Sequence, residues 1–70
     1  MKRVQWTVYL EDGCVKVRHS QRGVICAGVL SADGQVRDIA FLDERNRMNN
    51  MIRMPAMSAL MRWQEQQRKG

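Results

Sequence analysis

Hydrophobic and polar residues alternate over the N-terminal half of the chain, in short runs separated by turn-forming segments. Asp12-Gly13 and Asp33-Gly34 each lie between apolar runs, and this dipeptide supplies the positive φ angles of a tight hairpin turn. The pattern therefore predicts two hairpins that continue as an antiparallel meander. The strands are expected at about 4–11, 14–19, 23–31 and 35–42.

A two-residue loop at Asp12-Gly13 fixes the register of the first hairpin. It places Trp6 opposite His19 on one face and Tyr9 opposite Lys16 on the other, which is the alternation of a half-buried sheet. The same rule applied along the meander predicts a core made of Trp6, Val8, Leu10, Val15, Val17, Val24, Cys26, Leu30, Ile39 and Phe41.

The second hairpin leaves apolar residues on the outer face as well. With a two-residue loop at Asp33-Gly34, these side chains form a contiguous apolar patch, which favours an interface with a second copy or another protein. A three-residue loop would instead turn one strand over. The residues assigned to this interface are Ile25, Val29, Val36 and Leu42.

After Leu42 the apolar spacing becomes helical. Asp43 is a suitable N-cap for a short helix at about 44–53, and Pro55 is favoured at the first position of a second helix that reaches about 67. Five of the six methionines lie between 48 and 61, and we expect them mainly to fill the core, with partner binding as the alternative.

The predicted fold is α+β, in one small domain over residues 1–70: a four-stranded antiparallel β-meander followed by a C-terminal helical segment packed on one sheet face. This order of elements is similar to that of the transcriptional-coactivator single-strand-binding family, although no motif extends the similarity beyond the order. A core this small is thin, so we expect a homo-oligomer.

Charge indicates the class of partner. Twelve Lys and Arg residues against seven Asp and Glu residues give a net charge of +5, and nine of the bases are arginine. Guanidinium groups suit phosphate, and an aromatic side chain beside bases is typical of single-strand binding. DNA or RNA is therefore the leading partner. The predicted nucleic-acid-binding residues are Tyr9, Lys16, Arg18, Arg22, Arg45, Arg47, Arg53 and Arg62.

No known nucleophile or phosphate-loop signature is present, so neither catalytic residues nor a cofactor are expected. Cys14, His19 and Cys26 lack a fourth ligand and the paired-cysteine spacing of zinc sites, so we expect no metal. Strand alternation sends the two cysteines to opposite faces, which argues against a disulfide. His19 is expected to be a hydrogen-bonded structural residue.

Met1-Lys2-Arg3 leads directly into an alternating segment, so we expect no apolar leader, and no run of 18 apolar residues occurs in the sequence. We therefore expect no membrane association and a cytoplasmic location. The leading hypothesis is a small, homodimeric nucleic-acid-binding module. The alternative is a non-enzymatic phage- or plasmid-type inhibitor or adaptor that docks on an acidic protein.

Overall fold

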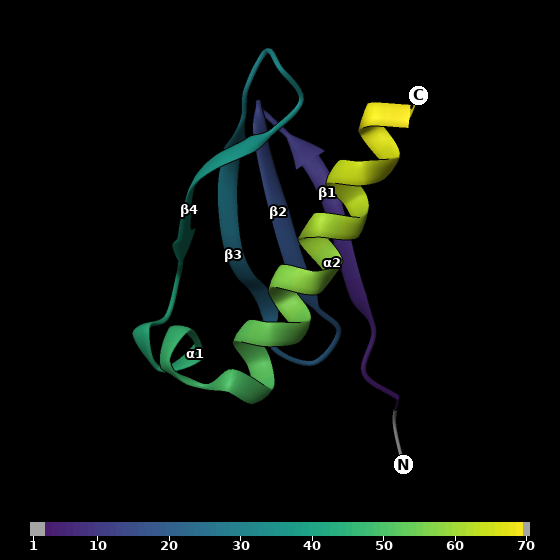
Figure 1. Cartoon of the computed structure of the whole chain (residues 1–70). Coiled ribbons are helices and arrows are strands. Elements are labelled where there is room, and N and C mark those ends of the chain that lie inside the picture. The colour runs from purple at the N-terminus through teal and green to yellow at the C-terminus, as the bar shows by residue number, and fades with distance from the viewer. Residues whose placement is uncertain (1–2, 70) are drawn as a thin grey trace.

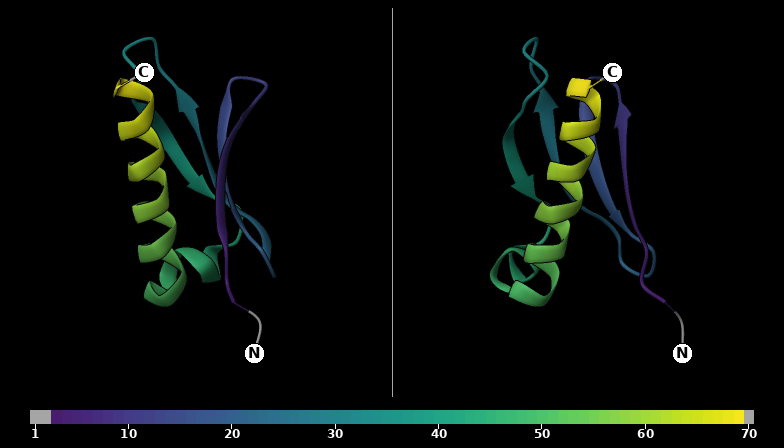
Figure 2. Two further views of the ribbon diagram at one scale, coloured as in Figure 1. Left: turned by 90° about the vertical axis from the view of Figure 1, so that its right-hand side faces the viewer. Right: turned by 45° about the vertical axis from the view of Figure 1, so that its right-hand side comes forward.

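The computed structural model describes residues 3–69, and the side chains of residues 3–67. Its elements, in chain order, are β1 (Trp6–Glu11), β2 (Cys14–His19), β3 (Gly23–Leu30), β4 (Val36–Phe41), α1 (Glu44–Met48) and α2 (Asn50–Lys69). The four strands form one antiparallel sheet in the order β1-β2-β3-β4, and α2 lies across one of its faces (Figures 1 and 2). The predicted α+β meander is confirmed.

The first hairpin has the predicted register. Trp6 pairs with His19, and the six pairs continue to Glu11 and Cys14. Asp12 and Gly13 have φ angles of 53° and 78°, the left-handed values that a two-residue hairpin turn requires. The turn type therefore determines which side chains of β1 and β2 share a face.

A β-bulge changes the faces at the start of β3. Val17 pairs with Cys26 but Arg18 pairs with Val24, so Ile25 is an extra residue in this strand. Ile25 is fully buried in the core, whereas Val24 shares the face of Arg18. The assignments of Ile25 to the outer face and of Val24 to the core are wrong, because the bulge shifts the register by one residue.

The second hairpin closes with a three-residue loop, residues 32–34. The Ser31 amide donates to the Gln35 carbonyl at 2.8 Å, and Gly34 adopts a φ of 86°. Leu30 therefore pairs with Val36, and Val36 packs against the core. The expectation that Val36 points outward is wrong, because the longer loop turns this end of β4 over.

A second bulge restores the predicted register farther along β4. Asp38 has a φ of 55°, and beyond it Ala27 pairs with Ala40 and Cys26 with Phe41. Phe41 therefore packs against the core as predicted. Gly28 lies opposite this bulge: a Cβ there would collide with Cγ1 of Val36 and approach Cγ1 of Ile39 to 3.1 Å.

The two helices divide at Asn49. Asp43 caps α1 as predicted, accepting a hydrogen bond from the Arg45 amide at 2.9 Å. Oδ1 of Asn49 accepts from the Met51 amide at 3.0 Å, so α2 begins at Asn50 and Pro55 lies inside it. The prediction of a helix that starts at Pro55 is wrong, because Asn49 supplies an earlier N-cap.

The core lies between α2 and the sheet. Its buried members are Val15, Val17, Ile25, Cys26, Ile52, Ala56 and Leu60. The partly buried side chains packed around them are Trp6, Val8, Leu30, Val36, Ile39, Phe41, Met57 and Trp63. Leu10, next to the Asp12-Gly13 turn, is 51% exposed and not part of this core, contrary to expectation.

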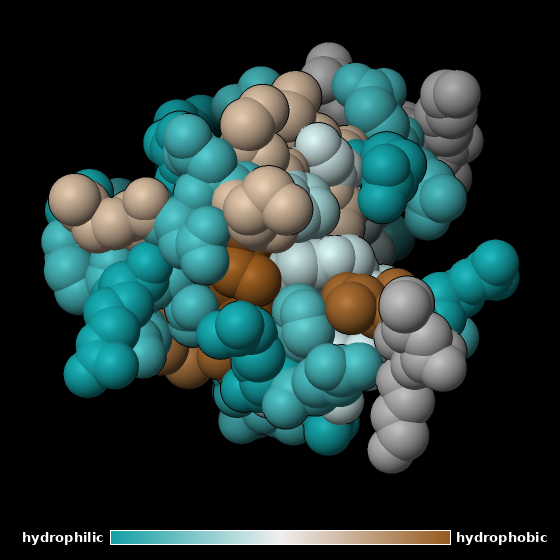
Figure 3. Space-filling view, turned by 90° about the horizontal axis from the view of Figure 1, so that it is seen from below, coloured by the Kyte–Doolittle hydropathy of each residue, from teal (hydrophilic) through white to brown (hydrophobic). Residues whose placement is uncertain are grey.

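Most of the methionines do not fill the core. Met57 packs against it, but Met48, Met51, Met54 and Met61 are between 61% and 82% exposed. Figure 3, which views the molecule from the end formed by α1 and the start of α2, shows hydrophobic side chains at the surface between hydrophilic ones. The core-filling expectation therefore holds for Met57 alone among these five. No described helix is both long enough and apolar enough to span a membrane.

Candidate nucleic-acid interface

The face of the sheet opposite α2 carries the predicted residues of β1 and β2. Tyr9 pairs with Lys16 and Thr7 with Arg18, so all four side chains share this outer face. Arg18 is exposed, whereas Tyr9 and Lys16 are half-buried. Arg22 is exposed in the turn that follows β2. Strand alternation alone therefore predicts the sheet face of Tyr9, Lys16 and Arg18 correctly.

These strands form a shallow hollow of about 350 Å³, lined by Gln5, Thr7, Tyr9, Arg18 and Ser20. Ser20 and Gln5 hold one end together: the Ser20 amide donates to the Gln5 carbonyl at 2.9 Å, and Oγ of Ser20 accepts from the Gln5 amide at 3.0 Å. Gln5 and Ser20 were not predicted as site residues. Extending the same alternation by one residue beyond each strand end would have found them.

Lys16 is less available than predicted. Its ammonium group donates to Oε1 of Glu11 at 2.5 Å, on the same face of the hairpin. This hydrogen bond, together with the negative charge of Glu11, raises the pKa of Lys16. A phosphate bound by Lys16 would have to compete with a carboxylate already in place.

The remaining arginines do not form one basic row. Arg47 is paired with Glu44 on α1, and Arg53 donates to Oδ1 of Asn50 at 2.9 Å. Arg45, with Glu44, Met48 and Asn49, lines an open hollow on α1. Arg62 lines a different groove, between β1 and α2. The predicted set of eight residues is therefore divided between the outer face and the helical half.

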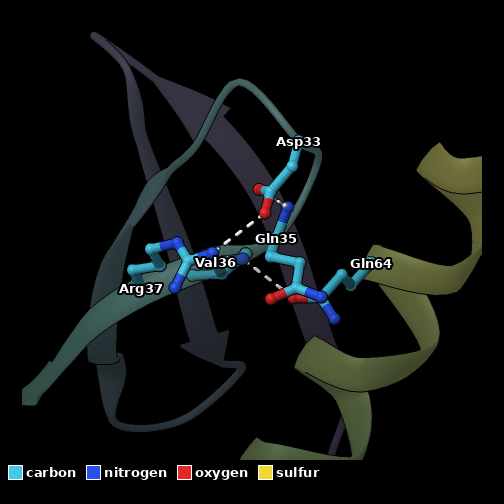
Figure 4. A network of polar contacts seen from close by, with 5 residues as sticks. All are labelled: Asp33, Gln35, Val36, Arg37 and Gln64. Atoms are coloured by element: carbon cyan, nitrogen blue, oxygen red, sulfur yellow. Dashed lines mark hydrogen bonds and ion pairs between the residues drawn. The ribbon is translucent and has the colours of Figure 1, made fainter.

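Asp33 forms an ion pair with one further arginine, Arg37, as Figure 4 shows. Its Oδ2 accepts from Nη2 of Arg37 at 2.9 Å, and its Oδ1 accepts from the Gln35 amide at 3.1 Å. The amide hydrogen bond, and then the guanidinium, lower the pKa of Asp33. Arg18 takes part in none of the ion pairs between described residues, so it is the guanidinium best placed to meet a phosphate on the outer face.

His19 is buried and hydrogen-bonded, as predicted. Its Nδ1 accepts from the amides of Gln21 at 3.0 Å and Arg22 at 3.2 Å. Burial, and then the nearby charge of Arg22, lower the pKa of His19, because both disfavour the protonated ring. His19 therefore fixes the turn after β2 as a neutral acceptor.

The cysteines lie on opposite faces of the sheet and both are free. Cys14 is half-buried on the outer face, and Cys26 is buried in the core, where desolvation raises its pKa to about 11. Within the described part of the chain, no three His, Cys, Asp or Glu side chains are grouped as they would be around a metal ion.

Of the four residues predicted to form an interface, only Val29 and Leu42 are exposed, by 47% and 68%. Ile25 and Val36 belong to the core instead.

Comparisons with protein-family models, with curated proteins and with solved structures found no match. The assignment of a function therefore depends on the chain's own residues.

Proposed function

We propose that the protein binds single-stranded nucleic acid on the outer face of β1 and β2. The observation that supports this most directly is the hollow in which an aromatic ring, Tyr9, and an exposed guanidinium, Arg18, lie beside two hydroxyl side chains. These are the groups that a nucleotide needs: a surface for stacking, a cation for its phosphate, and hydrogen-bonding partners for its sugar.

The shape of the face favours a single strand over a duplex. Its hollow of about 350 Å³ lies at the lower end of the range for small-ligand sites, so it has room for about one nucleotide unit. A common way to read a duplex is to place a helix in its major groove, and the long helix α2 packs on the opposite face of the sheet. An unpaired strand can instead lay one base on Tyr9.

Electrostatics supports the same partner. The net charge of +5 attracts a polyanion over several ångströms, and Arg22 follows two residues after Ser20, which lines the hollow. The proposal includes a homodimer, because the core is small and Val29 and Leu42 remain exposed. It also places the protein in a reducing cytoplasm, a location consistent with two free thiols.

Fluorescence anisotropy with labelled single-stranded DNA, single-stranded RNA and duplex DNA tests the proposal. At two salt concentrations, we expect a single strand to bind more tightly than the duplex, with affinity that falls as salt rises. Absence of binding at low salt contradicts the proposal.

An acidic protein is the second candidate partner, and the groove between β1 and α2 is the feature that favours this alternative.

A further inference from the structure

The two edge strands of the sheet, β4 and β1, differ in whether their backbone is protected from pairing with another strand. At the β4 edge, the amide of Val36 donates to Oε1 of Gln64 at 2.8 Å, so a side chain of α2 caps the strand (Figure 4). The bulge at Asp38 also interrupts β4. Both devices protect an edge from pairing with another chain. β1 has neither: it pairs with β2 along all six residues without a bulge.

The backbone of β1 presents hydrogen-bonding groups at this open edge. The Ser20 amide donates a hydrogen bond to the Gln5 carbonyl, and Glu11 and Cys14 form the pair that closes the hairpin turn. Because hydrogen-bonded pairs alternate with non-bonded pairs in an antiparallel ladder, the backbone groups of the odd-numbered residues of β1 bond to β2. The N–H and C=O groups of Trp6 and Val8 therefore point away from the sheet. No strand among residues 3–69 lies beyond them.

A groove of about 290 Å³ runs beside these free groups. It is lined by Trp6, Thr7, Val8, Ala59, Arg62, Trp63 and Gln66. The first three are consecutive on β1, and the four from α2 recur at helical spacing, so the groove lies between an edge strand and one side of a helix. Two half-buried tryptophans give it an apolar part, and the exposed Arg62 gives it a positive wall.

We propose that an extended acidic segment of a partner protein binds in this groove as a fifth strand, antiparallel or parallel to β1. Its backbone pairs with the free groups of Trp6 and Val8, which is strand addition to an exposed edge. Alternate side chains face the two tryptophans. A carboxylate of the segment meets Arg62, which takes part in none of the ion pairs between described residues.

Charge selects an acidic segment as the occupant. The chain carries +5, so a second copy in the groove would bring a like net charge against Arg62, whereas an acidic strand is attracted. This site is separate from the proposed nucleic-acid face, because β1 side chains alternate and the tryptophans lie on the side of α2. Failure of one proposal leaves the other unaffected.

Intrinsic tryptophan fluorescence reports on the groove directly, because both tryptophans of the chain line it. The probe is a heptapeptide with valine and glutamate in turn at its odd positions and threonine at its even positions, so that valine and glutamate share one face of the added strand. The same peptide with lysine in place of glutamate is its control. We expect saturable binding of the acidic probe only. Arg62→Gln should weaken it about fivefold, whereas Arg53→Gln, the same change elsewhere on α2, should leave it within twofold.

Backbone pairing is tested by amide hydrogen exchange. In the free protein the amides of Trp6 and Val8 should exchange quickly, and the acidic heptapeptide should slow both at least tenfold. N-methylation of the Val8 amide in a synthetic chain removes the free donor without removing a β1–β2 hydrogen bond. It should weaken binding of the acidic heptapeptide about tenfold. Any of three results overturns the proposal: no binding, equal loss in both arginine variants, or binding that leaves the two amides unprotected. Protection of these amides in the free protein, with dimers in sedimentation, overturns it in favour of a second copy.

Discussion

The ring of His19 meets the ring of Trp6 edge to face, with centroids 4.9 Å apart and planes at 85°. This contact closes the open end of the first hairpin, where Nδ1 of His19 also accepts two backbone amides. The two amide hydrogen bonds require an unprotonated Nδ1, so they connect the stability of the fold to the titration of this buried histidine.

The first prediction is a loss of stability in mild acid. The pKa of His19 is lowered from its ordinary 6.5 in the folded protein, so the unfolded chain binds more protons just below that value. The free energy of unfolding should therefore be nearly constant between about pH 7 and 8 and fall as pH decreases below 6.5. Urea denaturation at pH 7.5, 6.5 and 5.5 measures this. His19→Asn, whose amide oxygen can replace Nδ1 as an acceptor, should flatten the profile, and an unchanged slope contradicts the account.

The second prediction concerns the cap on β4. Gln64→Ala leaves the Val36 amide without its acceptor, which should cost about 1 kcal/mol of unfolding free energy. Gln67→Ala is the matched control, because Gln67 is exposed on the same helix. Amide exchange at Val36 should accelerate only in the Gln64 variant. Equal effects of the two substitutions would show that the hydrogen bond contributes nothing.

The third prediction tests the close approach at Gly28. Gly28→Ala places a methyl group against Cγ1 of Val36 in a buried position, so we expect a loss of about 1–3 kcal/mol. Adding Val36→Ala removes the colliding methyl, and the double variant should lose less than the sum of the two single changes. Denaturation of all four proteins measures this coupling, and simple additivity contradicts it.

The register of the first hairpin could be predicted in full because one dipeptide determines the turn and the turn determines the register. Asp33-Gly34 fits both a two-residue and a three-residue loop, and it is the longer loop that turned Val36 inward. The bulge at Ile25 has no signal in the alternation, since Val24 and Ile25 are equally apolar. The alternation of apolar and polar residues therefore predicts the sheet face of a side chain only where the strands pair without a bulge.

The same distinction holds for the candidate site. Tyr9 and Arg18 were placed correctly because they lie in the regular hairpin. The ion pair of Lys16 with Glu11 is a diagonal contact across the strands, and the register of directly opposite residues does not predict it. The position of Arg62 depends on how α2 docks against β1, and no pattern within the helix contains that information.

The fourth prediction concerns stacking on Tyr9. Tyr9→Leu keeps an apolar side chain but removes the ring, and it should weaken single-strand binding by about 1 kcal/mol or more, which is the range for one stacked base. Tyr9→Phe keeps the ring and should bind within about twofold of the native protein. Anisotropy with a labelled oligothymidine measures both. Equal loss in the two variants would assign the effect to the hydroxyl group instead.

The measurement that tests the central claim most directly compares Arg18→Gln with Arg53→Gln in salt titrations of the same labelled single strand. Both variants lose one positive charge, but only Arg18 lies in the hollow beside Tyr9. We predict that Arg18→Gln weakens binding roughly fivefold at low salt and reduces the salt slope by about 1, with little change for Arg53→Gln. Equal, small losses in both variants would contradict a site on the outer face, because net charge alone would then account for the binding.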